Sequence, residues 1–177
     1  MESVLTVNGK SYEVEKLLGK GKGGYSYLVH DYAGKYVLKQ IHHEPCDYYE
    51  FGDKVEAELS DYKKLKECGI SMPDLLDVDK ETERILKTYI EGETIFELVK
   101  KGEILEEYLE QMKEICRKVY AKKINIDYFP TNFVVKENRL WYIDFECNEY
   151  SEEWNFENWG VKYWSKTKEF LTYVKNH

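Results

Sequence analysis

Segments typical of β-strands, separated by tight turns, fill the first 41 residues and limit the possible folds more than any other feature. Val4–Val7 and Tyr12–Leu17 flank Asn8-Gly9, a dipeptide that readily takes the positive φ angles of a hairpin turn. Two further segments of the same kind follow, Tyr25–His30 and Lys35–Ile41. Because strands with such short connections pair with their neighbours in sequence, we expect an antiparallel meander.

A helix is predicted from about Gly52 to Cys68, followed by two more strands at Leu75–Asp79 and Arg84–Ile90. The helix is indicated by apolar residues that recur at spacings of three and four and therefore share one face. These residues are Val55, Leu59, Tyr62 and Leu65. Gly69 is placed to end the helix.

The pattern becomes mainly helical after Glu91-Gly92. A long apolar stripe predicts a central helix over roughly Leu105–Lys122. Phe133–Val135 and Leu140–Ile143 are typical of two short strands, and a last helix is expected over Gly160–Val174. We therefore expect an α+β fold with an antiparallel sheet and one helix in residues 1–90 and a mainly helical part in residues 91–177.

Composition limits the classes of partner. With 177 residues, the chain is long enough for a core and two small lobes. The net charge of −8 argues against general binding to nucleic acids or anionic membranes, because their phosphates would be repelled. No run of 18 apolar residues occurs and the N-terminus is strand-like, so we expect a cytoplasmic protein without a membrane partner.

Metal sites of the zinc type are not favoured. The four cysteines, Cys46, Cys68, Cys116 and Cys147, form no Cys-x-x-Cys pair, so buried thiols in a reducing compartment are the expected use. His42 and His43 are adjacent on a predicted strand and would point to opposite faces.

A glycine-rich segment, Gly19-x-Gly21-x-x-Gly24, would let main-chain amides approach phosphate oxygens. In isolation it fits a simple glycine-rich hairpin equally well, and a strand-like segment follows it rather than a helix. Lys39, on the next strand, could reach phosphates, although most lysines are solvated. Glu58 could orient Lys39 by ion pairing; Glu56 competes for this role, but Glu58 is nearer the apolar face.

Three residues in the second half carry more weight. Pro130 prevents a continuous helix between Asp127 and Asn132, so both side chains can project from one loop. Asp144 follows an apolar strand, so its carboxylate would emerge at the strand end. Carboxylate and amide oxygens suit Mg²⁺, and a second carboxylate can orient an attacking hydroxyl. For each residue alone, a turn or cap is the simpler interpretation.

Together these features resemble the eukaryotic-type protein kinase superfamily, in a minimal form similar to RIO kinases and related small prokaryotic kinases. The similarity runs from about Val14 to Phe145 and also includes Leu86–Gly92. It implies a two-lobed kinase-like fold with a truncated C-lobe, and ATP and Mg²⁺ as cofactors. The nucleotide-binding residues that it implies are Gly19, Gly21, Gly24, Lys39, Glu58, Tyr89 and Ile90, the last two through their main chain. The implied catalytic residues are Asp127, Lys39 and Asn132, and the implied metal ligands are Asn132 and Asp144.

The sequence also departs from this family. Asn125-Ile126-Asp127 replaces His-Arg-Asp, and Glu146 stands where Asp-Phe-Gly has glycine. Only 31 residues follow Glu146, too few for the peptide-docking helices of large protein kinases. We therefore expect a phosphotransferase whose hydroxyl acceptor, a protein serine or threonine or a small molecule, is not identified by the sequence. A nucleotide-binding pseudokinase and an ATPase-like regulatory module are the alternatives.

Overall fold

The computed structural model describes residues 3–21, 23–44, 53–104 and 106–177. Gly52, Leu105 and Cys46, which take part in the expectations above, lie outside these residues. The chain divides into two compact units. The first unit contains Met1–Ser60 and Pro73–Tyr89, and the second contains Asp61–Met72 and Ile90–His177.

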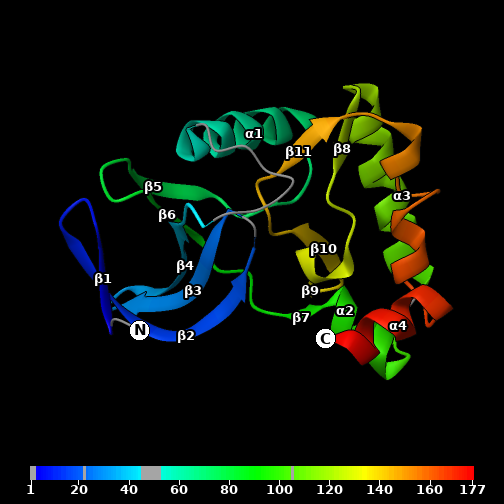
Figure 1. Cartoon of the computed structure of the whole chain (residues 1–177), viewed down its shortest axis with the longest axis horizontal. Coiled ribbons are helices and arrows are strands. Elements are labelled where there is room, and N and C mark those ends of the chain that lie inside the picture. The colour runs from blue at the N-terminus through cyan, green and yellow to red at the C-terminus, as the bar shows by residue number, and fades with distance from the viewer. Residues whose placement is uncertain (1–2, 22, 45–52, 105) are drawn as a thin grey trace. The chain divides into compact units, whose positions relative to one another are not determined.

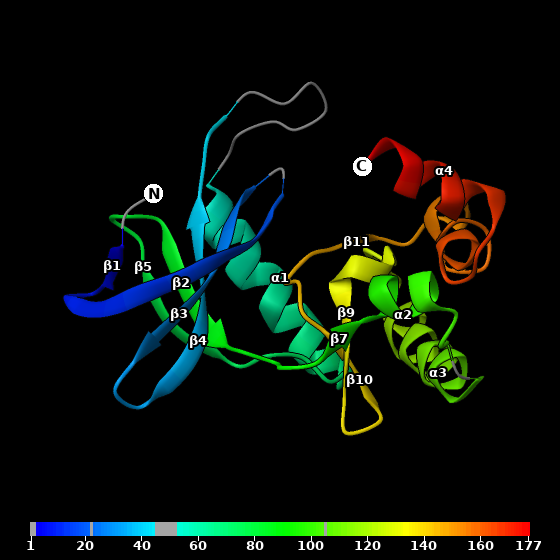
Figure 2. The same ribbon diagram turned by 90° about the horizontal axis from the view of Figure 1, so that it is seen from below.

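A six-stranded antiparallel sheet forms the first unit, and the predicted meander is confirmed (Figure 1). The spatial order is β1-β2-β3-β4-β6-β5. The strands are β1 (Val4–Val7), β2 (Lys10–Lys20), β3 (Gly24–Asp31), β4 (Gly34–Ile41), β5 (Leu75–Asp79) and β6 (Arg84–Thr88). Figure 2 shows the long hairpin that β2 and β3 form within this sheet.

The first hairpin turns at Asn8 and Gly9, as predicted, with φ angles of 48° and 82°. Val7 is paired with Lys10, so the turn has two residues with positive φ, the geometry that matches the twist of paired strands. The turn is also held from the far edge of the sheet, because the Asn8 main-chain N–H donates to Asp79 Oδ2 at 2.9 Å.

The predicted first helix is α1 (Lys54–Cys68), and Gly69 ends it with a φ of 75°. Val55, in its first turn, packs in a buried cluster with Ile41 and Ile85 from the sheet. This burial of one helical face explains why the spacing of apolar residues predicted the helix.

The strand expected over Arg84–Ile90 is shorter than predicted, because β6 ends at Thr88. The Thr88 main-chain N–H donates to the Asp74 carbonyl at 3.0 Å, and the Asp74 N–H donates to Thr88 Oγ1 at 2.9 Å. This two-way contact ends the strand, and Tyr89 and Ile90 lie in the connection that follows it.

The second unit contains two small antiparallel sheets. One has the order β10-β9-β7 and the other pairs β11 with β8. Their strands are β7 (Glu93–Thr94), β8 (Ile124–Ile126), β9 (Phe133–Lys136), β10 (Arg139–Tyr142) and β11 (Cys147–Glu149). The hairpin of β9 and β10 confirms the prediction, whereas β7, β8 and β11 were not predicted.

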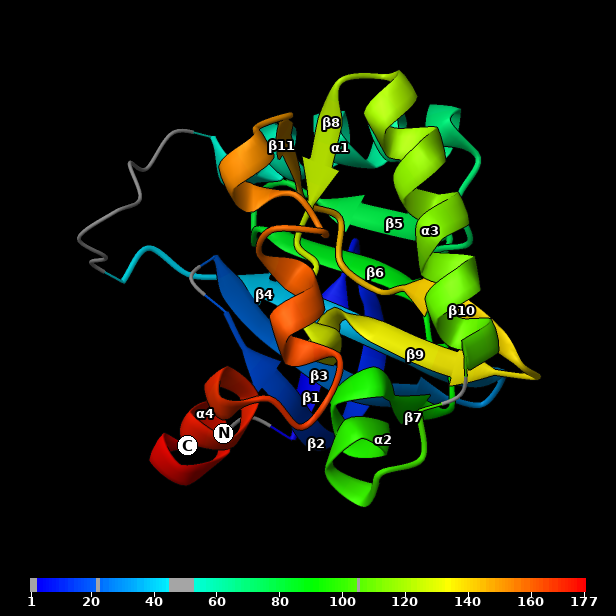
Figure 3. The same cartoon turned by 90° about the vertical axis from the view of Figure 1, so that its right-hand side faces the viewer.

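Helices complete the second unit: α2 (Ile95–Lys101), α3 (Glu106–Ala121) and α4 (Lys168–Asn176). The predicted central helix is α3, which lies beside β8 and β10 (Figure 3). The α2 helix was not predicted, although Thr94 caps it by accepting the Glu97 N–H at 3.1 Å. Within the described ranges, no helix is both long enough and apolar enough to cross a membrane. The α+β fold is the one expected of a truncated kinase-like chain.

The prediction of one helix over Gly160–Val174 was wrong. A 3-10 turn occupies Gly160–Tyr163, and α4 begins only at Lys168. Tertiary contacts impose the break, because the buried Trp164 donates its indole N–H to the Tyr128 carbonyl at 2.8 Å. Thr167 then starts α4 afresh by accepting the Phe170 N–H at 3.1 Å.

Replacement of Gly160 by alanine is expected to destabilise the protein. An added Cβ would lie 2.5 Å from Tyr128 Cβ and 2.9 Å from Phe156 Cδ2, so buried side chains would have to shift. Such overpacking lowers the free energy of unfolding by about 1–3 kcal/mol. Urea unfolding followed by circular dichroism measures the loss. Gly19→Ala is the control, because no described atom lies within 4 Å of the position that its Cβ would take. Equal losses in the two variants would contradict the packing argument.

Candidate active site

An ion pair in the first unit joins the predicted strand lysine to the helix. Lys39 of β4 donates to Glu58 of α1, and the two side chains are only 15% and 11% exposed. Glu56, the alternative partner, instead pairs with Lys80 at the surface. The sheet therefore selects Glu58 over Glu56.

Gly19 lies near the end of β2, Gly21 directly follows this strand, and Gly24 begins β3. Gly24 is required by packing, because an added Cβ would lie 2.8 Å from the Gln40 carbonyl oxygen and 3.0 Å from Lys39 Cε. At Gly21, a Cβ would meet only the Gly24 carbonyl oxygen, at 4.0 Å. Among the described atoms none approaches a Cβ at Gly19 within 4 Å. Crowding around an added Cβ thus explains only Gly24. At Gly21 the main-chain N–H donates to the Gly24 carbonyl at 2.9 Å, and Gly19 is paired with Ser26 in the sheet.

In the second unit, the pairing of β8 with β11 brings two distant loops together. Ile126 is paired with Cys147. Asp127 directly follows one member of this pair and Glu146 directly precedes the other, so an antiparallel ladder places them next to each other. Asp61 fastens β11, because its Oδ2 accepts the Cys147 N–H at 3.3 Å.

The β9–β10 hairpin brings the same two loops together at their other ends. Phe133 is paired with Tyr142, and the Ile143 N–H donates to the Asn132 carbonyl at 3.0 Å. Asn132 and Asp144 therefore leave neighbouring strands at the same end. The Asn132 side-chain amide nitrogen donates to the Asp127 carbonyl at 3.4 Å, which leaves its amide oxygen outside this bond.

Three partly buried carboxylates meet where these loops converge. One oxygen each of Asp127, Asp144 and Glu146 lies within 4.8 Å of the others, close enough to share a metal ion. Across the ranges that the structure describes, no other set of three His, Cys, Asp or Glu side chains meets this criterion. Glu146 was not among the predicted metal ligands. The sequence feature that could have indicated it is its position, because it stands where the Asp-Phe-Gly motif of the resembling family has glycine.

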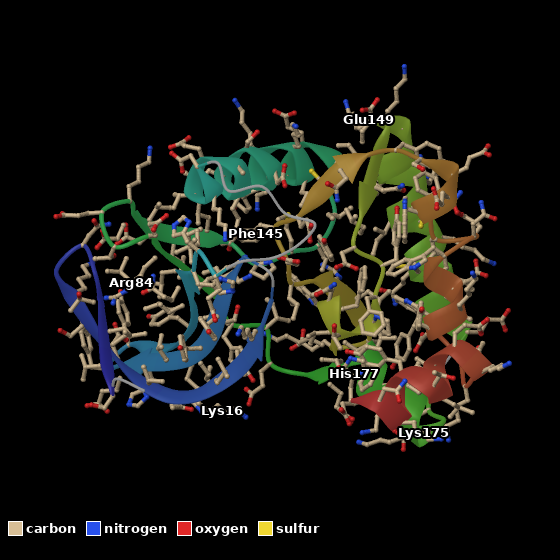
Figure 4. All side chains as sticks on the ribbon, viewed as in Figure 1. Lys16, Arg84, Phe145, Glu149, Lys175 and His177 are labelled. Atoms are coloured by element: carbon tan, nitrogen blue, oxygen red, sulfur yellow. The ribbon has the colours of Figure 1, made fainter. Side chains whose placement is uncertain are left out.

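Asp144 is fixed by the residue that follows it. Its Oδ1 accepts the Phe145 main-chain N–H at 2.8 Å. The Phe145 ring (labelled in Figure 4) is buried and lies 4.6 Å from the ring of Tyr62. Burial of this aromatic ring thus anchors the acidic segment.

The environment of Asp127 raises its pKa from 3.8 to about 6. Burial is the main cause, and the negative charges of Glu146 and Asp144 add to it. The Phe129 N–H, which donates to Asp127 Oδ1 at 3.1 Å, opposes the shift. A carboxylate whose pKa lies near neutrality can exchange a proton under physiological conditions.

Comparison with known proteins places the chain. No model of a known protein family matches it. It is 27% identical over 137 residues, 72% of its length, to the KEOPS complex subunit Bud32 of Pyrococcus abyssi. It is 34% identical over 89 residues, 50% of its length, to a probable bifunctional tRNA threonylcarbamoyladenosine biosynthesis protein of Methanococcus maripaludis strain C7. These similarities support the resemblance to the kinase-like superfamily.

The chain spans only part of the length of these relatives. The matched region is 62% of the Pyrococcus protein and 16% of the Methanococcus protein. The roles of the site residues are therefore judged on their own geometry.

Asn125, which stands where the resembling family has histidine, has a structural role. Asn125 is only 4% exposed. Its amide nitrogen donates to the Ser151 carbonyl at 3.0 Å, and its Oδ1 accepts the Tyr128 hydroxyl at 3.1 Å. Since both the nitrogen and the oxygen of the amide are bonded, Asn125 helps to hold the loop that carries Asp127.

Replacement of Asp127 by asparagine is expected to change how stability depends on pH. Because the folded pKa of about 6 lies above 3.8, the folded protein holds this proton more tightly than the unfolded chain. The resulting stabilisation is complete below 3.8 and is lost as pH rises through 6. It amounts to at most about 3 kcal/mol.

Urea unfolding in metal-free buffer between pH 4 and pH 8 measures the effect. Asp127→Asn should gain stability relative to the wild type as pH rises through this window, because the variant has no carboxylate to ionise. Glu149→Gln, at an exposed position (labelled in Figure 4), controls for the change in net charge. If the free energies of unfolding of Asp127→Asn and the wild type changed with pH in parallel, the Asp127 carboxylate would not have the raised pKa.

Proposed function

We propose that this kinase-like chain binds ATP with Mg²⁺ and transfers the γ-phosphoryl group to a hydroxyl acceptor. The observation that carries the proposal is the convergence of Asp127, Asp144 and Glu146 within 4.8 Å. In a protein of net charge −8, three carboxylates this close repel one another. A divalent cation with a bound nucleotide would relieve that repulsion.

The division of roles follows from the chemistry of each group. Asn132 and Asp144 would hold Mg²⁺, a hard ion that takes oxygen ligands and keeps several waters. The ion would neutralise charge on the transferred phosphoryl group, as in other phosphotransferases. Glu146, which lies beside Asp144, adds a further carboxylate to the same cluster.

Asp127 would orient the acceptor hydroxyl and take its proton. Its pKa of about 6 suits this role, because a base is most effective when its pKa lies near the working pH. The acceptor would be a serine or threonine hydroxyl of a protein or the hydroxyl of a small molecule.

The phosphates would be met by residues of the first unit. Lys39, held by Glu58, would contact the phosphates of ATP. The main chain at Gly19, Gly21 and Gly24 would lie over them, and the main chain at Tyr89 and Ile90 would meet the adenine. In this proposal, residues 1–90 act as an N-lobe and residues 91–177 as a reduced C-lobe.

An ATPase that works within a tRNA-modifying assembly is the second candidate. The names of the relatives favour it, because one is a KEOPS complex subunit and another a tRNA threonylcarbamoyladenosine biosynthesis protein. In that case water replaces the acceptor hydroxyl, and protein partners determine when ATP is hydrolysed. Since the net charge of −8 disfavours general nucleic-acid binding, partners would supply most of the contact with tRNA.

Phosphate release from ATP, with and without candidate acceptors, separates these functions. Release that requires an acceptor indicates a kinase, release by the protein alone indicates an ATPase, and nucleotide binding without release indicates a pseudokinase. Asp127→Asn should keep ATP binding and lose about 10²–10⁴-fold in turnover. Asp144→Ala should weaken Mg²⁺-dependent ATP binding itself. Undiminished turnover in Asp127→Asn would refute its catalytic role, and Glu149→Gln serves again as the charge control.

Lys39 offers a second test with a matched control. Lys39→Met should lower turnover by about 10²-fold, because one positive group beside the phosphates is lost. Lys80→Met removes a lysine that also pairs with a glutamate of α1, but at an exposed position. The control should keep its turnover. Equal effects of the two substitutions would show that Lys39 acts only through stability.

A further inference from the structure

A buried hydroxyl lies at the junction of the two loops of the candidate active site. Tyr142, the last residue of β10, is 0% exposed. Its Oη accepts the Asp127 main-chain N–H at 3.2 Å and donates to the Glu146 carbonyl at 2.8 Å. One side-chain oxygen therefore links the main chain at two residues of the carboxylate cluster.

The main chain and the ring of Tyr142 are both held in place by neighbouring residues. Its main-chain N–H donates to the Ser71 carbonyl at 3.0 Å, and its ring lies 5.2 Å from the ring of Phe133. Burial raises the pKa of Tyr142 well above its ordinary value, so the hydroxyl stays protonated and remains a donor. The immobilised Tyr142 side chain thus offers its hydroxyl as an acceptor to one loop and as a donor to the other.

We propose that Tyr142 is a positioning residue that holds the main chain of Asp127 against that of Glu146 so that the Asp127 carboxylate faces its reaction partner. This inference rests on the proposed function. The main chain at Asp127 is bonded to Tyr142, and the carboxylate is bonded to the Phe129 N–H. With both ends tied, the side chain has little freedom to turn.

Loss of the hydroxyl alone tests the proposal. Tyr142→Phe keeps the ring and removes both hydrogen bonds, so the Asp127 N–H and the Glu146 carbonyl each lose a partner. We expect the hydrogen-exchange protection of the Asp127 amide to fall by about tenfold, the effect of one lost hydrogen bond. We expect kcat to fall by about 10- to 100-fold, because a small displacement of a catalytic group has such an effect. KM for ATP should stay within about twofold, since the phosphate contacts are unchanged.

Tyr120→Phe is the matched control. The Tyr120 hydroxyl also accepts a main-chain N–H, from Phe156 at 2.9 Å, and donates to Glu157 at 2.7 Å. It lies outside the carboxylate cluster, so its loss should change thermal stability but neither kcat nor the protection of the Asp127 amide. A fall in kcat that Tyr120→Phe shares would reveal a purely structural effect and overturn the proposal.

The readouts separate failure of this inference from failure of the proposed function. Unchanged protection of the Asp127 amide in Tyr142→Phe overturns the positioning role, whether or not the protein turns over ATP. Unchanged kcat in Tyr142→Phe, when Asp127→Asn is inactive, overturns it as well. If Asp127→Asn retains full turnover, the proposed function fails, and the protection of the amide alone decides whether Tyr142 holds Asp127.

Discussion

Two short antiparallel pairings, β8 with β11 and β9 with β10, hold the candidate active site together. One pairs Ile126 with Cys147 and the other pairs Phe133 with Tyr142. The loop from Asp127 to Asn132 and the segment from Ile143 to Glu146 are thereby fixed at both ends. Three carboxylates within 4.8 Å repel one another. The two strand pairings and the buried Tyr142 hydroxyl must hold the carboxylates together against that repulsion. The geometry of the site therefore depends on these short strands.

The sequence was sufficient to predict elements whose conformation depends only on neighbouring residues. Asn8-Gly9 predicted the first hairpin because few other residues adopt its positive φ angles. Glu137 and Asn138 take the same role between β9 and β10, with φ angles of 51° and 63°. Part of the candidate site could be predicted in the same way. Asp127 and Asn132 are five positions apart in one loop, so their proximity is also a local property.

Tertiary contacts decided what the sequence could not predict. The strands β8 and β11 have three residues each, too few for a recognisable alternation, and it is their pairing that places Glu146 next to Asp127. Glu56 and Glu58 lie on the same helix, and only the position of Lys39 on the sheet selects between them. A single helix was expected over Gly160–Val174, yet Trp164 is buried and bonded to the Tyr128 carbonyl, and the helix begins only at Lys168. In each case a distant partner outweighs local preference.

In the proposed function, protonation and metal binding would compete for the same carboxylates. Without a cation, part of the repulsion is relieved when Asp127 holds a proton, which its pKa of about 6 permits near neutral pH. A divalent ion at Asp144 and Glu146 would supply positive charge instead and favour release of that proton. Arrival of the metal would then convert Asp127 from an acid into the carboxylate that a phosphotransferase needs. Glu146 would contribute to both, because its negative charge raises the pKa of Asp127 and its carboxylate lies in the same cluster as that of Asp144. A glycine there would leave Asp127 ionised at lower pH and the metal more weakly held.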